Sequence, residues 1–456
     1  DTAETLQRHG IPAAEAEEAV RVAWSDAFER MEKIQARTEN EQYDPWIGQL
    51  DVLVGESMRE SLLSRASVED GELVEDFVKR YGMVYLPNIF RWFVWTSRAK
   101  SMDDLTEEQK KEIANGLGIN VYGDRNLVEG NDISHLGDDF VRMTGGERNV
   151  IRNNLFHDNS LEDWPGSGAH IDGVQNWCVD GGLPTHHLLI ENNVMIDAPS
   201  TDTHFVIYQD EGACGNSDYL VRYNFVHALG SYVQINDNRT VGVRLYGNTF
   251  ADSGVAYTPR GWDALGFQND SSGGAVINNI FVDTVRDGGS VYGVDDTSLP
   301  GFVARNNLAF TSTCGASCSW RAPILDETDV VLSQDPLFVG PDDPSLQAGS
   351  PAIDRGGSLT LVAAADTGSG TTLLVDDAGF FQDGWAGVDP DWIAVGATDN
   401  AAAIVSIDDA TSTITLATGV SRTPGDPVWL YRDSDGTQVL FGAAPDIGAS
   451  ESPGGG

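Results

Sequence analysis

Short apolar runs interrupted by single polar residues fill the middle of the chain, and one pattern returns between about residues 119 and 310. Each copy has two or three apolar positions and then an asparagine, as in Leu189-Ile190-Glu191-Asn192-Asn193. The copies end at Asn131, Asn154, Asn193, Asn224, Asn248, Asn279 and Asn307, so the unit has roughly 23 residues with insertions. A repeat of this length is typical of a solenoid.

A second apolar run precedes each copy. These runs are centred on residues 122, 142, 175, 209, 234, 268 and 292, and apolar residues flank each centre. Alternation with a period of two indicates strands with one buried face. Two or three short strands per unit, with an asparagine at a polar corner, predict a right-handed parallel β-helix over 118–356. The corner amide can bond to the coils above and below it. A leucine-rich repeat would need leucines at fixed positions and a helix per unit, and neither is found.

The segments on either side of the coils differ from them. Apolar residues at three- and four-residue steps predict an α-helical N-terminal domain over 1–117 that caps the first coil. The run 84–95 is the densest aromatic stretch, and it fits either a core of that domain or a docking surface. Residues 357–443 alternate strand-like runs with Asp- and Gly-rich turns, which predicts a small β-barrel or sandwich inserted before a return segment at 444–456.

The charge of the chain excludes some partners. The formal net charge is −42, and acidic residues are spread along the sequence. Such a field repels nucleic acid and anionic membranes, so we expect neither as a partner. No apolar run is long enough to span a bilayer. The sequence begins at Asp1 without a signal peptide, so we expect a processed chain or a fragment.

The four cysteines are placed in two pairs. Cys178 and Cys214 follow equivalent strands of adjacent coils, within bridging range, and Cys314 and Cys318 share one loop. We therefore expect the disulfides Cys178–Cys214 and Cys314–Cys318 and an extracellular or cell-surface location. A zinc site is the weaker alternative because neither pair has the usual spacing.

Two motifs near the C-terminal end of the sequence, together with the repeats, resemble those of a known group of proteins. Ser350-Pro351-Ala352-Ile353-Asp354 and Asp446-Ile447-Gly448-Ala449-Ser450-Glu451, together with the coils, resemble the secreted parallel β-helix proteins of the pectate-lyase-like superfamily. The resemblance implies a polysaccharide as partner and a lyase, hydrolase or epimerase activity. The Gly-His-Gly and Arg-x-Lys signatures of polygalacturonase-like hydrolases are absent, and residues 118–310 contain no lysine.

Polar residues at the strand centres form a candidate binding face. We expect Gln175, Gln209, Gln234 and Gln268 to stack above Arg142 on the outer side of the first sheet, with Trp177 beside them. Amides offer donors and acceptors to sugar hydroxyls, and an aromatic ring stacks on a sugar face. The alternative is a polar ladder that keeps the sheet soluble.

The candidate catalytic residues come from two adjacent coils, next to this polar face. Asp139 and Asp172 occupy matching positions before their strands, and His170 and Arg142 lie nearby. Three uses are open: a carboxylate pair that hydrolyses a glycoside, a lyase with His170 as base and Arg142 stabilising the anion, or a calcium site formed by Asp138, Asp139 and Asp172.

Two classes of function follow. The first is an extracellular polysaccharide-binding protein that cleaves its ligand by lyase or hydrolase chemistry on the first-strand face. The second is a structural filament, sheath or spike subunit that assembles through the helical head and the β-rich insert.

Overall fold

The computed structural model describes residues 84–85, 118–134, 136, 139–158, 171–178, 183–196, 204–210, 214–227, 235–251, 265–284, 291–311 and 328–452. Most of the predicted helical domain at 1–117, including the capping helix, lies outside these residues. The exception is β1 (Val84–Tyr85), which pairs antiparallel with the first strand of the solenoid. This part of the aromatic run therefore covers a sheet edge that would otherwise invite pairing with another chain.

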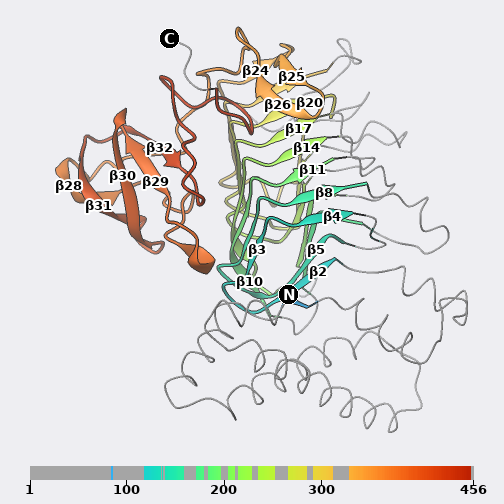
Figure 1. The fold of residues 1–456 in the computed structure, drawn as a ribbon. Coiled ribbons are helices and arrows are strands. Elements are labelled where there is room, and N and C mark those ends of the chain that lie inside the picture. Colours follow the sequence, from blue (N-terminus) through green and yellow to red (C-terminus); the bar gives the residue numbers. More distant parts are fainter. Residues whose placement is uncertain are drawn as a thin grey trace, which may run out of the picture.

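Three sheets of stacked parallel strands form the body of the molecule (Figure 1). Sheet A contains β2 (Ile119–Tyr122), β5 (Val141–Thr144), β9 (Val174–Cys178), β12 (Val206–Asp210), β15 (Ile235–Asn238), β18 (Leu265–Gln268) and β21 (Tyr292–Val294). Sheet B contains β3 (Leu127–Glu129), β7 (Val150–Arg152), β10 (Thr185–Glu191), β13 (Ser217–Arg222), β16 (Arg244–Tyr246), β19 (Ala275–Ile277) and β22 (Val303–Arg305), with β6 (Gly146–Glu147) beside β10.

Sheet C completes each coil. Its strands are β4 (Asp132–Ser134), β8 (Leu155–His157), β11 (Val194–Met195), β14 (Phe225–His227), β17 (Thr249–Ala251), β20 (Ile280–Val282), β23 (Leu308–Phe310) and β24 (Val331–Leu332). Each turn of the chain thus adds one strand to each sheet, and the parallel β-helix predicted from the repeat is confirmed.

Inward-facing apolar side chains of successive coils fill the interior. Val141, Val174 and Val206 are paired in register and fully buried. Phe250 and Phe281 stack at 5.5 Å between ring centroids in neighbouring coils. Because similar side chains recur at equivalent positions of successive coils, the core consists of columns of stacked side chains.

The predicted asparagine column is present between sheets B and C. In each step, from Asn131 to Asn307, the side-chain amide and the backbone amide both donate to the side-chain oxygen of the next asparagine, over 2.8–3.1 Å. The residue before each asparagine has a positive φ of 53–66°, as at Asn153, Tyr223 and Gly247. The corner therefore needs a residue in the left-handed backbone conformation to turn the chain, and a side-chain amide to form hydrogen bonds with the buried backbone groups.

The insert is a closed antiparallel barrel. Its strand order is β27 (Thr360–Leu361), β32 (Pro427–Arg432), β29 (Trp392–Val395), β30 (Ala397–Asp408), β31 (Thr413–Arg422) and β28 (Gly368–Leu374). A bridge between Val362 and Val375 joins the two outer strands and closes the sheet. A short 3-10 helix, η3 (Trp385–Gly387), lies between β28 and β29. Of the two predicted architectures for this segment, the structure has the barrel.

The two ending motifs meet on the β-helix. Ile447 donates its backbone amide to the Ala352 carbonyl at 3.0 Å, and Asp446 accepts the Asp354 amide at 2.8 Å. Both apolar residues are buried beside Ile280, Leu308 and Val331. A hairpin of β25 (Phe338–Gly340) and β26 (Asp343–Leu346) lies near this end of the stack.

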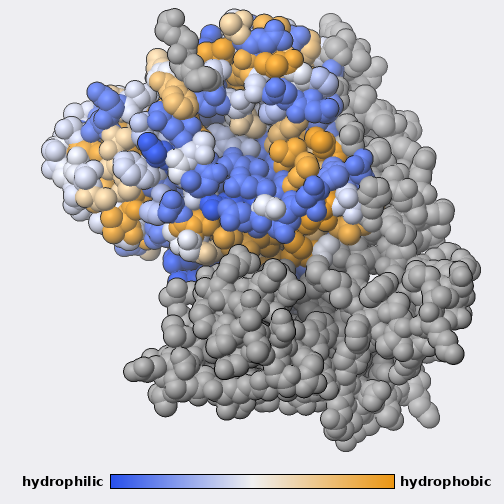
Figure 2. All heavy atoms as spheres, viewed as in Figure 1, coloured by the Kyte–Doolittle hydropathy of each residue, from blue (hydrophilic) through white to orange (hydrophobic). Residues whose placement is uncertain are grey.

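The barrel lies against sheet B. Side chains on the outer side of this sheet, such as Leu189, Leu220 and Tyr246, form one buried cluster with Phe380, Trp385 and the barrel core. Hydrophilic residues gather in the middle of the face shown in Figure 2, beside the barrel. None of the described segments forms a helix long and apolar enough to cross a membrane.

Candidate active site

Asp139, Asp172 and His204 stack at one corner of the β-helix. Each lies two residues before the equivalent valine of β5, β9 or β12, so the register of sheet A places them above one another. Asp139 Oδ1 accepts the backbone amide of Asp172 at 3.1 Å, and Asp172 Oδ1 accepts that of His204 at 2.8 Å. The carboxylates thus satisfy the backbone of the next coil, as the asparagines do at the other corner.

The second oxygen of each carboxylate binds a side chain three residues further on. Arg142 donates from Nε and Nη2 to Asp139 Oδ2 at 3.0 and 2.7 Å. Gln175 donates from Nε2 to Asp172 Oδ2 at 3.3 Å. Both carboxylates are 0% exposed, whereas the Arg142 side chain is 25% exposed. Among these three side chains, Arg142 is therefore the most exposed.

His204 completes the cluster, and it is not among the candidate residues identified from the sequence. Its Nδ1 lies 2.9 Å from Asp172 Oδ1, and its side chain is 11% exposed. An ionised carboxylate only accepts hydrogen bonds, so with Asp172 ionised the Nδ1 atom donates to it, and in the neutral ring Nε2 then carries no hydrogen. The signal was readable: His204-Phe205-Val206 occupies the same place as Asp139-Phe140-Val141 and Asp172-Gly173-Val174.

The predicted glutamine stack has a different register. Gln175 pairs with Arg142 below it, as predicted, but with Ile207 above it, and Gln209 pairs with Trp177 and Asn238. Gln268 pairs with Asn238 and is exposed. The predicted single column of Arg142, Gln175 and Gln209 is therefore wrong: Gln209 lies two residues further along its strand than Ile207, the residue that pairs with Gln175.

Other predicted site residues lie outside what the structure describes. These are His170, Gln234, Asp138 and the pair Cys314 and Cys318, and the side chains of Trp177 and Gln209 are also outside the description. The disulfide Cys178–Cys214 is present and joins the ends of β9 and the segment after β12. Within the described part of the chain, no group of three or more His, Cys, Asp or Glu side chains is arranged to hold a metal ion.

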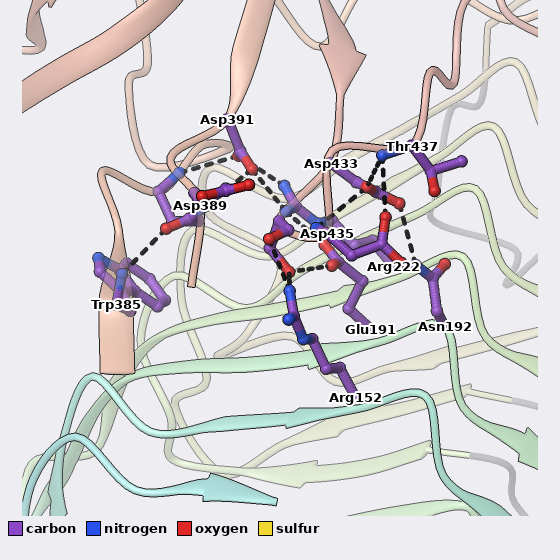
Figure 3. Close-up of polar contacts among 12 residues, drawn as sticks. Arg152, Glu191, Asn192, Arg222, Trp385, Asp389, Asp391, Asp433, Asp435 and Thr437 are labelled. Carbon is purple, nitrogen blue, oxygen red and sulfur yellow. Dashed lines mark hydrogen bonds and ion pairs between the residues drawn. The ribbon is translucent and has the colours of Figure 1, made fainter. Parts of the chain in front are cut away.

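A second charged cluster joins the barrel to sheet B (Figure 3). Arg222 of β13 is completely buried and lies between Glu191 of β10 and Asp391 of the barrel. Its Nη1 and Nη2 bind the two oxygens of Asp391 at 2.7 Å, and Nη1 also binds Tyr246 Oη at 2.7 Å. Burial alone would lower the pKa of Arg222, but Asp391 and Glu191 raise it well above its usual value.

The same seam holds further carboxyl groups. The Ser434 hydroxyl donates to Glu191, and Arg152 binds both Ser434 and Glu129. Burial, with the nearby Glu191 charge, raises the pKa of Asp433 to about 8. These groups bind one another across the interface, so this cluster fixes the barrel in place on sheet B.

Comparisons with known proteins address the fold. A family profile described as "Right handed beta helix region" matches residues 110–269, which include the first coils of the stack. The chain is a right-handed parallel β-helix protein.

A solved structure entitled "The complex structure of XylC with xylose" resembles this β-helix protein at 14% identity and a TM-score of 0.31. The match covers 74% of the β-helix protein and 57% of that chain. At this identity and TM-score the likeness bears on no residue or reaction. No curated protein matches the β-helix protein.

Proposed function

We propose that this β-helix protein is an extracellular polysaccharide lyase that acts on a uronate-containing chain. The observation that carries the proposal is the Asp172–His204 contact, in which a buried carboxylate orients an imidazole at the rim of sheet A. The partly exposed Arg142 lies on the same side, one coil from Asp172 and two coils from His204. The disulfide Cys178–Cys214 supports an oxidising location.

The reaction is a β-elimination. His204 Nε2 takes the proton from the carbon beside the uronate carboxyl group, and Arg142 pairs with that carboxylate as charge builds on it. The electron pair left on carbon then forms a carbon–carbon double bond to the adjacent ring carbon, as the bond from that carbon to the glycosidic oxygen breaks. The leaving oxygen takes up a proton from water, so the products are a new chain end and an unsaturated sugar.

The geometry supports a lyase over a hydrolase. A glycosidase needs two carboxyl groups in contact with the glycosidic oxygen and with water or the anomeric carbon. Asp139 and Asp172 are 0% exposed and accept bonds from the next coil, from Arg142 and from Gln175. Their role is to position Arg142 and His204, which differs from the acid and base roles that the sequence suggested.

The test is an incubation with polyuronates and neutral glycans, read by the ultraviolet absorbance of the unsaturated product and by reducing ends. We expect unsaturated product from a polyuronate, and a loss of at least about 100-fold in His204→Gln. His227→Gln is the matched control, since His227 Nδ1 also binds an aspartate, Asp342, at 2.7 Å but lies on sheet C. Reducing ends without unsaturated product would indicate hydrolysis, and full activity in His204→Gln would refute the assignment.

A further inference from the structure

A β-bulge at the end of β32 gathers two aromatic rings and a cation on the barrel. Trp392 pairs with Arg432 and Ile393 pairs with Leu430, so Tyr431 is an extra residue opposite β29. A bulge of this kind turns two neighbouring side chains toward one partner residue, and bulges are over-represented beside functional sites. The Arg432 guanidinium carbon accordingly lies 5.6 Å from the Trp392 ring centre and 5.8 Å from that of Tyr431.

The Trp392 side chain is exposed on the surface of the barrel. On β30 its cross-strand neighbour is Ala403, which is too small to cover the ring. Trp392 is 39% exposed, while Ile393 beside it points into the barrel core and is completely buried. Packing inside the barrel therefore does not account for this tryptophan.

Arg432 is a cation that no carboxylate of the described chain neutralises. Its Nη1 makes a long bond of 3.4 Å to the Gly436 carbonyl, and its Nε has no hydrogen-bond partner among the described residues. By contrast, Arg222, Arg244 and Arg422 each pair with an aspartate. In a protein with a net charge of −42, an arginine left beside two rings points to an anionic ligand.

We propose that Trp392, Tyr431 and Arg432 form a second saccharide site, which holds a uronate unit of the polysaccharide away from the cleavage site. The sugar ring stacks on Trp392, and its carboxylate pairs with the Arg432 guanidinium. The ligand class rests on the proposed function, whereas the site itself rests on the barrel geometry. The barrel then anchors the polymer while the corner of sheet A cleaves it.

The test measures retention of the full-length protein by polygalacturonate and by alginate, and by their carboxyl-reduced forms, at physiological ionic strength. We expect Trp392→Ala and Arg432→Gln each to weaken binding about tenfold. Ala403→Gln should weaken binding by covering the ring while all three site residues remain. The control is Val405→Ala, since Val405 is 56% exposed on the same barrel and lies outside the site. Arg432→Gln should no longer distinguish the acidic polymers from their reduced forms.

Two results separate this inference from the proposed function. If the protein binds either polyuronate through the barrel but produces no unsaturated sugar, the lyase proposal fails and the second site stands. If it cleaves a polyuronate while all three site variants bind as the wild type does, the second site is refuted alone. Absence of binding to both polyuronates, or equal losses in Val405→Ala, would also overturn it.

Discussion

Arg222 offers the sharpest test of how the barrel is held on the β-helix. Arg222→Met keeps the volume of the side chain but removes the only positive charge between Glu191 and Asp391 within the described seam. Removing one member of a buried ion pair typically costs about 3–5 kcal/mol, because the remaining charges stay buried without a partner. The Tyr246 hydroxyl loses a donor as well, although it still donates to the Phe380 carbonyl at 2.8 Å.

The loss should depend on pH in a defined direction. Burial raises the pKa of Glu191 even in the presence of Arg222, and without the arginine it rises further. Protonation neutralises an orphaned carboxylate, so we expect a smaller loss of stability at pH 5 than at pH 8. Urea unfolding measures the free energy, and hydrogen exchange of the β29 amides reports detachment of the barrel.

Two comparisons make the reasoning refutable. Arg148→Met removes a partly exposed pair with Glu147 and should cost less than about 1 kcal/mol. Replacing all three members by apolar residues of similar size should restore much of the loss, because no unpaired charge then remains. Equal stability of Arg222→Met and Arg148→Met would show that the buried pairs do not hold the interface.

Three further predictions concern the coils and the seam. Asn224→Ala deprives the Asn193 amides of their acceptor and should cost about 2–4 kcal/mol in urea unfolding, with both neighbouring coils losing exchange protection. Asp433 has a folded pKa of about 8, raised from about 4, so folding is penalised as pH rises through this window, and Asp433→Asn should gain at least about 1 kcal/mol at pH 8 and nothing at pH 4. Reduction of Cys178–Cys214, which are 36 residues apart, should cost about 4 kcal/mol and lower the melting temperature.

The fold was predictable because one residue type solves the same problem in every coil. A buried corner leaves backbone amides that need an acceptor, and an asparagine side chain both accepts and donates. The repeat of Asn131, Asn154 and Asn193 therefore reports the stacking directly, and the hydrogen bonds follow it.

The register of sheet A was harder to predict. Strand side chains alternate with a period of two, so moving Gln209 by two residues keeps it on the same face and preserves the apolar pattern. Alignment by polar character therefore placed Gln209 above Gln175, whereas the hydrogen bonds place it above Trp177. Alignment by the residues before each strand, Asp172 and His204, gives the correct register.

The buried charges of the seam were partly visible in the sequence. The residues two positions before Asn131, Asn154, Asn193 and Asn224 are Glu129, Arg152, Glu191 and Arg222, so their charges alternate. On neighbouring strands of sheet B each of these residues is paired with the next. An outward column of this kind normally faces water. Here the barrel covers the column, and Arg222 pairs with Asp391, which lies far along the chain. No local sequence pattern predicts that contact.

The barrel enters and leaves the β-helix at a single point. The Gly356 amide donates to the Pro445 carbonyl at 2.8 Å, so the chain departs and comes back along neighbouring backbone. A cassette with adjoining ends can be lost, gained or exchanged between genes without disturbing the register of the coils beneath it. Homologous proteins can therefore differ in the domain inserted at this point while they keep the same β-helix and its asparagine corners.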